Sequence, residues 1–340
     1  MDSPARPFDD IRSLVARMPG PDLEAAAAVR RRDRELTKPA GSLGRLEDIA
    51  EWLAAWQGRA PPQVVRPVCA VFAANHGVAA RGVSAYPAAV TRQMVENFAA
   101  GGAAINQICG VFDIGLKVFD LALDMPTPDI TEAPAFDEAG CAGTIAFGME
   151  AVAGGADLLC VGEMGIGNTT IAAAMAVALF GGAPADWVGP GTGVDEAGLE
   201  RKRAAVTAAL DRHRGHLDDP LEVLRRLGGR EIAAMVGAIV AARCEHVPVL
   251  IDGYVAGAAA AVLHRLDPHA LDHCLAAHRS AEPAHGRLLE CLGKTPLLDL
   301  GMRLGEGSGA ALAVGIVKAA AAVHAGMATF AQAGVATKEG

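Results

Sequence analysis

Short apolar runs alternate with segments of helical spacing over most of the chain. Five runs lack the apolar–polar alternation of a half-exposed strand, which predicts strands buried on both faces. They cover residues 67–74, 114–123, 157–163, 247–253 and 273–280. The segments between them are typical of helices, and one of these, residues 88–112, is expected to be a single helix. Buried strands that alternate with helices predict an α/β fold with a parallel sheet.

The N-terminal part differs, because residues 8 to about 60 show helical patterns only. Ser42 stands where it can cap the helix that opens "SLGRLEDIAEWLAAWQ". Three prolines then interrupt the pattern, at positions 61, 62 and 67. This break predicts a linker into a new domain.

Composition narrows the class of protein. The chain has 340 residues, of which 51% are hydrophobic and 20% charged, as in a globular protein. The formal net charge is −9, and no Lys/Arg cluster with interleaved aromatic residues occurs, which argues against nucleic acid as a partner. The seven cysteines are scattered in mostly apolar surroundings without a C-x-x-C pair, as in reduced cytoplasmic proteins. With no apolar signal core and no uninterrupted apolar span, we expect a cytoplasmic protein that does not enter a membrane.

Candidate chemistry follows the strands, because ligands of open α/β sheets bind beyond the carboxyl ends of the strands. The segments there are "NHGV" (75–78), "GEMGIGNTT" (162–170), "DGYVAG" (252–257) and "HRSAEPAH" (278–285). Two glycine-rich turns, "GPGTGVD" (189–195) and "LGEGSG" (304–309), precede further helices. Together these segments predict a rim of glycine, hydroxyl and acidic residues.

The segment "GEMGIGNTT" follows a strand and opens a helix. Glycines let backbone amides approach an anion, and the helix N-terminus favours negative charge. The segment lacks the lysine of a P-loop, so a phosphate would be held mainly by amides. Asn168, Thr169 and Thr170 fit equally well as helix caps or as ligand contacts.

Two acids stand on this rim. Glu163 ends a strand, and Glu306 lies between two glycines at the mouth of a long apolar helix. Burial would raise the pKa of either carboxylate towards the range of a general base. The alternatives are a structural acceptor for backbone amides at Glu163 and a helix-dipole acid at Glu306. The flanking glycines of Glu306 favour a substrate close by.

A metal centre and a hydrolase triad are both disfavoured. His76 has no second His or Cys at ligand spacing, which favours a hydrogen-bonded core histidine. The pair His278 and His285 does not match a zinc-binding helix. The sequence contains no G-x-S-x-G motif. We therefore expect no bound metal.

Seven motifs in register give a specific resemblance. From about residue 36 to residue 325 the chain resembles the nicotinate-nucleotide–dimethylbenzimidazole phosphoribosyltransferases of cobalamin lower-ligand assembly. The motifs are "LTKPAGSLGRLE", "HGVAARGVSAYP", "GEMGIGNTT", "GPGTGVD" with "RKR", "DGYVAGAAA", "HRSAEPAH" and "LLDLGMRLGEGSGAAL".

This resemblance implies a fold, an assembly and a reaction. The fold would be a Rossmann-like α/β domain over residues 63–309, with a small helical domain over residues 1–62 on which C-terminal helices at about 310–335 pack. The assembly would be a homodimer. The substrates would be nicotinate mononucleotide and 5,6-dimethylbenzimidazole, and the products α-ribazole 5′-phosphate and nicotinate, with inversion at the anomeric carbon and without cofactor.

The resemblance also implies roles for individual residues. Glu306 matches the family's general base, which removes a proton from one benzimidazole nitrogen while the other attacks the ribose. Glu163 and Lys202 match a supporting acid and lysine. Phosphate and ribose contacts fall on Gly165, Asn168, Thr169, Gly191, Thr192, Ser280, Leu304 and Gly305. Base contacts fall on Ser84, Tyr86, Gln93 and Met94, although core packing explains Tyr86 and Met94 about as well. Asn75 departs from the pattern, because many relatives carry Asp there.

Other functions stay open at this point. A related enzyme could use another base, such as adenine or a phenolic acceptor, and residues 84–94 would decide this. A nicotinamide-dependent dehydrogenase would need G-x-G-x-x-G after the first strand, where "NHGVAARG" stands instead. A nucleotide-binding regulatory module would not need Glu306 beside its ligand.

Overall fold

The computed structural model describes residues 6–336 and is built on a five-stranded parallel sheet with the order β2-β1-β3-β4-β5. The strands are β1 (Pro67–Ala73), β2 (Gly115–Asp120), β3 (Leu158–Met164), β4 (Val249–Ile251) and β5 (Cys274–Ala276). All five expected strands are present, and the expected α/β class is confirmed. The expectation that every strand is buried on both faces is wrong for β2, which lies at the sheet edge and contains no buried residue. β4 and β5 are shorter than the apolar runs that contain them.

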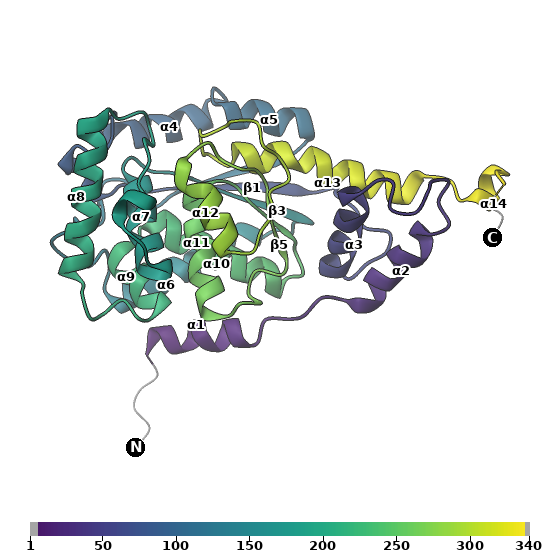
Figure 1. The fold of residues 1–340 in the computed structure, drawn as a ribbon, viewed down its shortest axis with the longest axis horizontal. Coiled ribbons are helices and arrows are strands. Elements are labelled where there is room, and N and C mark those ends of the chain that lie inside the picture. Colours follow the sequence, from purple (N-terminus) through teal and green to yellow (C-terminus); the bar gives the residue numbers. More distant parts are fainter. Residues whose placement is uncertain (1–5, 337–340) are drawn as a thin grey trace, which may run out of the picture.

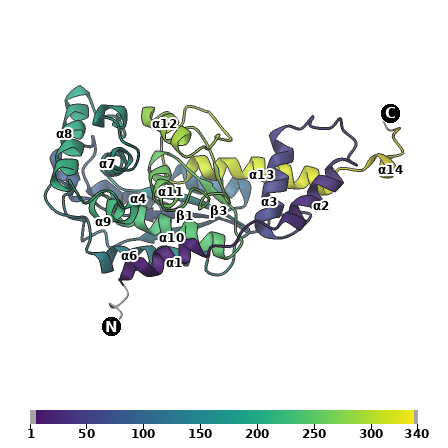
Figure 2. The same cartoon turned by 60° about the horizontal axis from the view of Figure 1, so that its bottom comes forward.

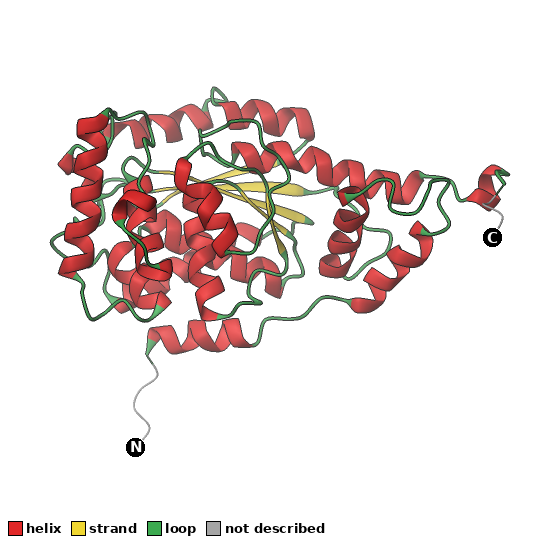
Figure 3. Cartoon of the chain, in the orientation of Figure 1, coloured by secondary structure: helices red, strands yellow, loops and turns green. Residues whose placement is uncertain are grey.

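Helices cover both faces of the sheet, so the molecule has three layers (Figure 1, Figure 3). One face carries α4 (Ala89–Ala99), α5 (Ala104–Phe112) and α13 (Ser308–Gly326). The other carries α6 (Glu138–Gly148), α10 (Arg230–Cys244) and α11 (Tyr254–Leu266). Beside the sheet lie α7 (Asn168–Phe180), α8 (Glu196–Arg212), α9 (Pro220–Leu227) and α12 (Pro283–Cys291). Short 3-10 turns are η1 (Gly77–Arg81), η2 (Met149–Val152) and η3 (Pro184–Asp186).

Strand β1 shows why the strands lack apolar–polar alternation. Cys69 and Val71 pack into the core beneath α5 and α13, whereas Ala70 and Phe72 pack into the core beneath α10. All four side chains are fully buried. Successive side chains of a strand point to opposite faces, so a strand covered on both sides must be apolar throughout.

Two local predictions are wrong, and glycine explains both. The expected helix over residues 88–112 is divided into α4 and α5 at Gly101, which has φ +77°. Ser42 does not cap a helix, because α3 (Arg45–Gln57) begins three residues later and Gly44 occupies the cap position. Glycine adopts positive φ readily, and positive φ is not helical, so Gly101 prevents one continuous helix and Gly44 sets the start of α3.

Helices from the two chain ends meet at one end of the molecule (Figure 1, Figure 2). There α2 (Leu23–Asp33) and α3 pack together and against α13, and α14 (Phe330–Ala333) lies beyond them. Apolar residues of α2, α3 and α13 share one core with β1. The division into domains at about residue 62 stays a prediction, and the shared core shows that this helical group is continuous with one face of the sheet.

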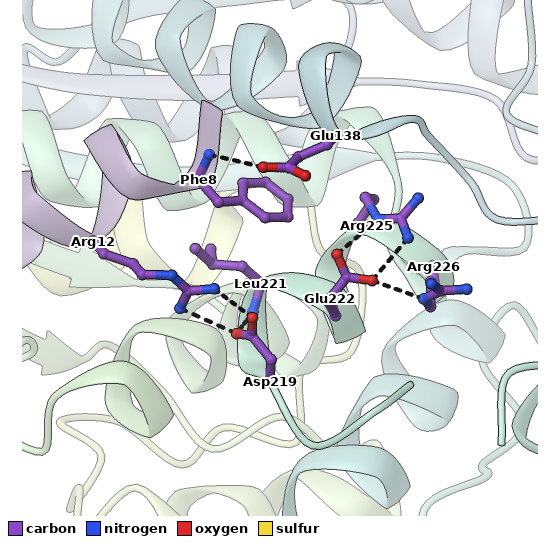
Figure 4. Close-up of polar contacts among 8 residues, drawn as sticks. All are labelled: Phe8, Arg12, Glu138, Asp219, Leu221, Glu222, Arg225 and Arg226. Atoms are coloured by element: carbon purple, nitrogen blue, oxygen red, sulfur yellow. Dashed lines mark hydrogen bonds and ion pairs between the residues drawn. The ribbon is translucent and has the colours of Figure 1, made fainter. Parts of the chain in front are cut away.

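Helix α1 (Pro7–Ala16) lies away from α2 and α3, against the α/β layer. Its Phe8 is buried in the core that contains α6 and α10, and the Phe8 amide donates to Glu138 Oε1 at 3.2 Å. Arg12 forms an ion pair with Asp219 just before α9 (Figure 4). Nearby, Glu222 accepts from Arg225 and Arg226 of the same helix. The first helix is therefore anchored on the α6–α9 side of the molecule.

Helix α13 is long and apolar enough to cross a membrane by length and composition alone. Half of its apolar window is buried inside the protein, where it packs against α3, α5 and β3. Core helices of soluble proteins meet the same criteria, and the packing of α13 is that of a core helix.

Candidate active site

The order of the strands reverses between β1 and β3, because β2 pairs with one edge of β1 and β3 with the other. Ligands of open parallel sheets bind outside the strand ends at such a switch point. A cavity of about 540 Å³ opens there. It is lined by residues of six segments: Tyr86, Glu163, Met164, Gly165, Ile166, Asn168, Thr169, Gly191, Thr192, Gly253, Tyr254, Val255, His278, Ser280, Glu282, Arg303, Leu304 and Gly305.

The turn before α13 has an unusual backbone. Gly305, Glu306 and Gly307 have φ values of +83°, +62° and +74°, so Glu306 adopts a left-handed conformation without being a glycine. The turn lies directly on β3, where a Cβ at Gly162 would come within 2.3 Å of the Gly307 nitrogen. A strained non-glycine residue persists only where the surrounding structure holds it, and such residues cluster at functional sites.

The Glu306 side chain is buried beneath the rim of the cavity rather than on its surface. It is 5% exposed, and its Oε2 atom has no hydrogen-bond partner. Burial raises the pKa of Glu306 to about 7, and the nearby Asp252 carboxylate adds to the rise. A carboxylate with a free oxygen and a pKa near neutrality has the properties of a general base.

Asp252, which follows β4, holds the start of α13 in place. Its Oδ1 accepts from the amide of Ala310 at 2.8 Å and lies 3.6 Å from Nε2 of His278. Burial raises the pKa of Asp252, while His278 and the helix amides act in the opposite direction. The carboxylate thus satisfies the N-terminus of α13 and places negative charge near Glu306.

Glu163 lies at the end of β3 and lines the cavity. Burial raises its pKa to about 8, and the carboxylates of Glu231, Asp252 and Glu306 add to this effect. Its Oε2 accepts a hydrogen bond from the Asn168 side chain. Glu163 is therefore the more readily protonated of the two candidate acids at neutral pH.

The polar residues at the start of α7 do not cap that helix. Gly167 occupies the cap position and no side chain makes a capping bond. Instead, Asn168 donates to Glu163, and Thr169 Oγ1 accepts from Nζ of Lys202 at 2.9 Å. Thr170 Oγ1 is buried without a partner. The sequence left caps and ligand contacts equally possible, and the observed contacts direct Asn168 and Thr169 to other site residues.

Lys202 is buried behind the cavity wall, at 1% exposure. Besides Thr169, its Nζ donates to the carbonyl of Gly189 at 2.7 Å. Burial lowers the pKa of Lys202 to about 8, an effect that the carboxylate of Glu282 partly offsets. Glu282 in turn accepts from the amide of Gly191 at 3.2 Å. Lys202 and Glu282 together fix the glycine turn at 189–191.

The structure brings together most of the expected site residues. All of the expected phosphate and ribose contacts line the cavity, namely Gly165, Asn168, Thr169, Gly191, Thr192, Ser280, Leu304 and Gly305. Among the expected base contacts, Tyr86 lines the cavity, and Ser84 Oγ lies 3.1 Å from Thr192 Oγ1 at its edge. Gln93 is exposed, and Met94 packs against the core beneath α13. The structure does not place Gln93 and Met94 on the cavity.

Several lining residues were not singled out from the sequence. Arg303 adds a cation to the rim and donates to the carbonyl of Gly191 at 2.9 Å. Glu282 stands in "HRSAEPAH", whose position after β5 was itself a signal. His278 of the same segment was considered only as a metal ligand, and it also lines the cavity. Arg303 is two residues before Gly305, so proximity to the turn was the only signal for it. His76 is a buried, hydrogen-bonded histidine, as expected.

A cavity at the switch point of a parallel sheet, rimmed by glycine turns, places the molecule among α/β enzymes that bind small ligands at their strand ends. The family model described as "Phosphoribosyltransferase" matches residues 18–335. The chain belongs to the nicotinate-nucleotide–dimethylbenzimidazole phosphoribosyltransferase family.

The relatives that show this cover nearly the whole chain. The protein of that name from Rhizobium etli (strain CIAT 652) is 70% identical over 332 residues, 98% of each chain. The one from Rhizobium meliloti (strain 1021) is 68% identical over 339 residues, 100% of each chain. The crystal structure of the protein from Thermus thermophilus superposes with a TM-score of 0.86 at 43% identity, covering 93% of this chain and 99% of that one.

Proposed function

We propose that this chain transfers phosphoribose from nicotinate mononucleotide to 5,6-dimethylbenzimidazole, in cobalamin nucleotide assembly, with Glu306 as general base. The observation that carries the proposal is the buried Glu306 carboxylate. It has an unpaired oxygen and a pKa of about 7, beside a cavity rimmed by glycine turns. The names of relatives about 70% identical over the full length support the choice of substrates.

The chemistry balances without a further reactant. Ionised Glu306 takes the proton from one benzimidazole nitrogen while the other nitrogen attacks the anomeric carbon of the ribose. A new carbon–nitrogen bond forms as the bond to the nicotinate ring nitrogen breaks. The leaving ring is cationic before cleavage and regains its lone pair on departure, so it needs no proton from the protein. Attack opposite the leaving group inverts the anomeric carbon.

Glu163 and Lys202 support this step without bonding to the reacting atoms. In its protonated form Glu163 adds no charge next to Glu306, so the base ionises more easily. Lys202 stays behind the wall, where it holds Thr169 and the carbonyl of Gly189. We propose that both residues arrange the groups that contact substrate.

The phosphate and ribose would occupy the part of the cavity with the most donors. Backbone amides of the glycine turns and hydroxyl groups supply these donors, and Arg303 supplies a positive charge. The residues concerned are Gly165, Asn168, Thr169, Gly191, Thr192, Ser280, Leu304 and Gly305. A phosphate held by amides and one arginine is consistent with a net acidic protein.

The acceptor base would lie against the apolar part of the rim. Tyr86 and Leu304 line the cavity and are 55% and 57% exposed, which leaves their apolar surfaces free for a flat ring. Ser84 is close enough to the rim to orient a ring nitrogen. Contacts from Gln93 and Met94 would require a movement of α4, and they remain part of the proposal on resemblance alone.

The proposal is tested by mixing the protein with nicotinate mononucleotide and 5,6-dimethylbenzimidazole and measuring both products by mass. We expect nicotinate release that depends on the acceptor, and a product of the mass of α-ribazole 5′-phosphate. Parallel reactions with adenine and a phenol test the alternative acceptors. Binding of nicotinate mononucleotide without release in the presence of any acceptor would favour a regulatory module instead.

We also propose a homodimer that works in the cytoplasm. The proposal of a dimer is supported by the resemblance to the family. Light scattering after size-exclusion chromatography tests the dimer, and a monomer at micromolar concentration would contradict it.

A further inference from the structure

A buried pair of residues, the couple His76 and Glu231, lies behind the cavity wall. Nε2 of His76, in the loop after β1, lies 2.8 Å from Oε1 of Glu231 in the first turn of α10. Both side chains are fully buried. Burying a carboxylate costs folding free energy unless the group is paired and hydrogen-bonded. The proposed reaction has so far given no role to Glu231.

The couple is next to the residues that hold Glu163. A Cβ built on Gly165 would lie 3.1 Å from His76 Nε2 and 3.4 Å from Asn168 Nδ2. Asn168 Nδ2 donates to the Glu163 carboxylate. The chain of neighbours therefore runs from Glu231 through His76 and the Gly165–Asn168 turn to Glu163.

The carboxylate of Glu231 also has its second oxygen free of any bond. Its Oε2 atom is buried without a hydrogen-bond partner, as is Nδ1 of His76. The neighbouring Arg230 does not pair with it but donates to the carbonyl of Met125. Only Oε1 of Glu231 is thus hydrogen-bonded, and after burial this carboxylate is the largest contribution to the raised pKa of Glu163.

We propose that Glu231, held in place by His76, is a positioning residue that keeps Glu163 protonated near neutral pH and so leaves the base Glu306 free to ionise. The pair does not touch the substrate. This proposal rests on the proposed function for its kinetic readout only.

The groups that shift the pKa of Glu163 come from four elements. Glu231 on α10, Asp252 after β4 and Glu306 before α13 all raise the pKa of Glu163 in addition to burial, and Asn168 on α7 lowers it. Two neighbouring acids that repel each other do not ionise together, and their titrations are coupled. When Glu163 is neutral, Glu306 can lose its proton at a lower pH than it could beside a second charge.

The test is Glu231→Gln, which retains the shape and a hydrogen bond to His76 but removes the charge. The titration of Glu163 is followed by carbon-13 NMR of protein labelled at glutamate carboxyl groups, with Glu163→Gln identifying the signal. We expect the Glu163 midpoint to fall by about one pH unit. This readout needs no substrate, so it stands even if the proposed function fails.

In the kinetic readout, the same variant narrows the pH profile of kcat/KM from both sides. Glu163 ionises at lower pH, which lowers the apparent pKa of the alkaline limb. Its charge then raises the apparent pKa of the acidic limb. The KM for nicotinate mononucleotide stays within about threefold, because the phosphate contacts are unchanged.

A matched control separates this role from packing. His273 is also fully buried, and its Nε2 donates to the carbonyl oxygen of Ile239 at 3.0 Å. It lies just before β5, at the end of that strand away from the cavity. His273→Gln should lower the melting temperature without narrowing the profile. If Glu231→Gln does not fold, Glu231→Asp withdraws the charge by one methylene and should produce a smaller shift in the same direction. An unchanged Glu163 midpoint in a folded variant would overturn the proposal.

Discussion

The backbone amide of Glu306 donates to the carbonyl oxygen of Glu163 at 3.2 Å. This bond joins the turn before α13 to the end of β3, so the two candidate acids share one rigid scaffold. Their carboxylates influence each other, because the charge of Glu306 contributes to the raised pKa of Glu163. A change in one acid should therefore be measurable in the behaviour of the other.

Replacing Glu306 by glutamine should abolish most of the turnover. The amide keeps the shape of the side chain but cannot accept the benzimidazole proton, and general-base catalysis typically contributes about 10²–10⁴ in rate. We expect kcat to fall by this factor while the affinity for nicotinate mononucleotide, measured by calorimetry, changes less than about threefold. Acceptor-dependent nicotinate release at nearly the wild-type rate would exclude Glu306 as the base.

The rate should depend on pH as a bell. Glu306 must be ionised, so kcat/KM should rise through its pKa of about 7. Protonated Glu163 assists, so the rate should fall again through its pKa of about 8. In Glu163→Gln, which cannot ionise, the alkaline limb should disappear, and the acidic limb should stay near its wild-type position because Glu163 is uncharged there. A steady-state profile from about pH 5.5 to about pH 9.5 measures both limbs.

Stability should decrease with increasing pH in the same range. The folded-state pKa values of Glu163 and Glu306 lie above the ordinary value of 4.5, so the folded protein binds more protons than the unfolded chain. Their contribution is complete below about pH 4.5 and is lost as the pH rises through the folded-state pKa values of about 7 and about 8. We expect the free energy of unfolding to fall by on the order of 5 kcal/mol between about pH 5.5 and about pH 8.5.

Denaturant titrations at the two pH values measure this loss. In Glu163→Gln the difference between them should be smaller, because one of the two protons is no longer exchanged. A free energy of unfolding that increases over this interval would show that other groups dominate.

Gly162→Ala should disrupt the site from behind. The added Cβ would come within 2.3 Å of the Gly307 nitrogen and 2.9 Å of the Glu306 carbonyl carbon, so the turn must move away from β3. We expect the free energy of unfolding to fall by about 1–3 kcal/mol. We expect kcat to fall by a larger fraction of its value than the free energy of unfolding does, because the turn that carries Glu306 is displaced. The matched control is Gly143→Ala on α6, where a Cβ meets nothing within 4 Å. It should stabilise the protein by about 0.5–1 kcal/mol with normal activity.

Glu306→Gly should separate strain from catalysis. Glycine adopts φ +62° without penalty, and the substitution also removes a buried carboxylate that lacks a partner for Oε2. We expect a higher melting temperature than in Glu306→Gln, together with an equal loss of turnover. A lower melting temperature than in the glutamine variant would show that the packing lost with the side chain outweighs the relief of strain.

The sequence predicts the sheet well because its physical signal is local. Residues 67–74 are apolar at every position, and β1 is buried on both faces, as expected. Helix ends were less predictable. The glycines at 101 and 44 decide where α4 ends and α3 begins, but a glycine in a sequence does not show which sign its φ will take.

The site was predictable where glycine, hydroxyl and acidic residues followed a strand. Asn168, Thr169 and Glu163 fit that pattern and meet at the cavity. The buried charged residues behind the cavity wall did not fit that pattern. Lys202 on α8 and Glu231 on α10 are buried charges within helices, and only tertiary packing brings them to the cavity wall. Met94 shows the opposite case, because its motif suggested the site and its partly buried side chain packs against the core beneath α13.

The packing of α13 has a consequence for the behaviour of the unfolded protein. In the folded molecule this 19-residue apolar helix holds the Glu306 turn against the sheet. In a newly made or heated chain the same segment is exposed, and a long apolar stretch then favours association with other unfolded chains. The segment that supports the Glu306 turn is thus a main site of aggregation risk, and low protein concentration during refolding should increase the yield of active enzyme.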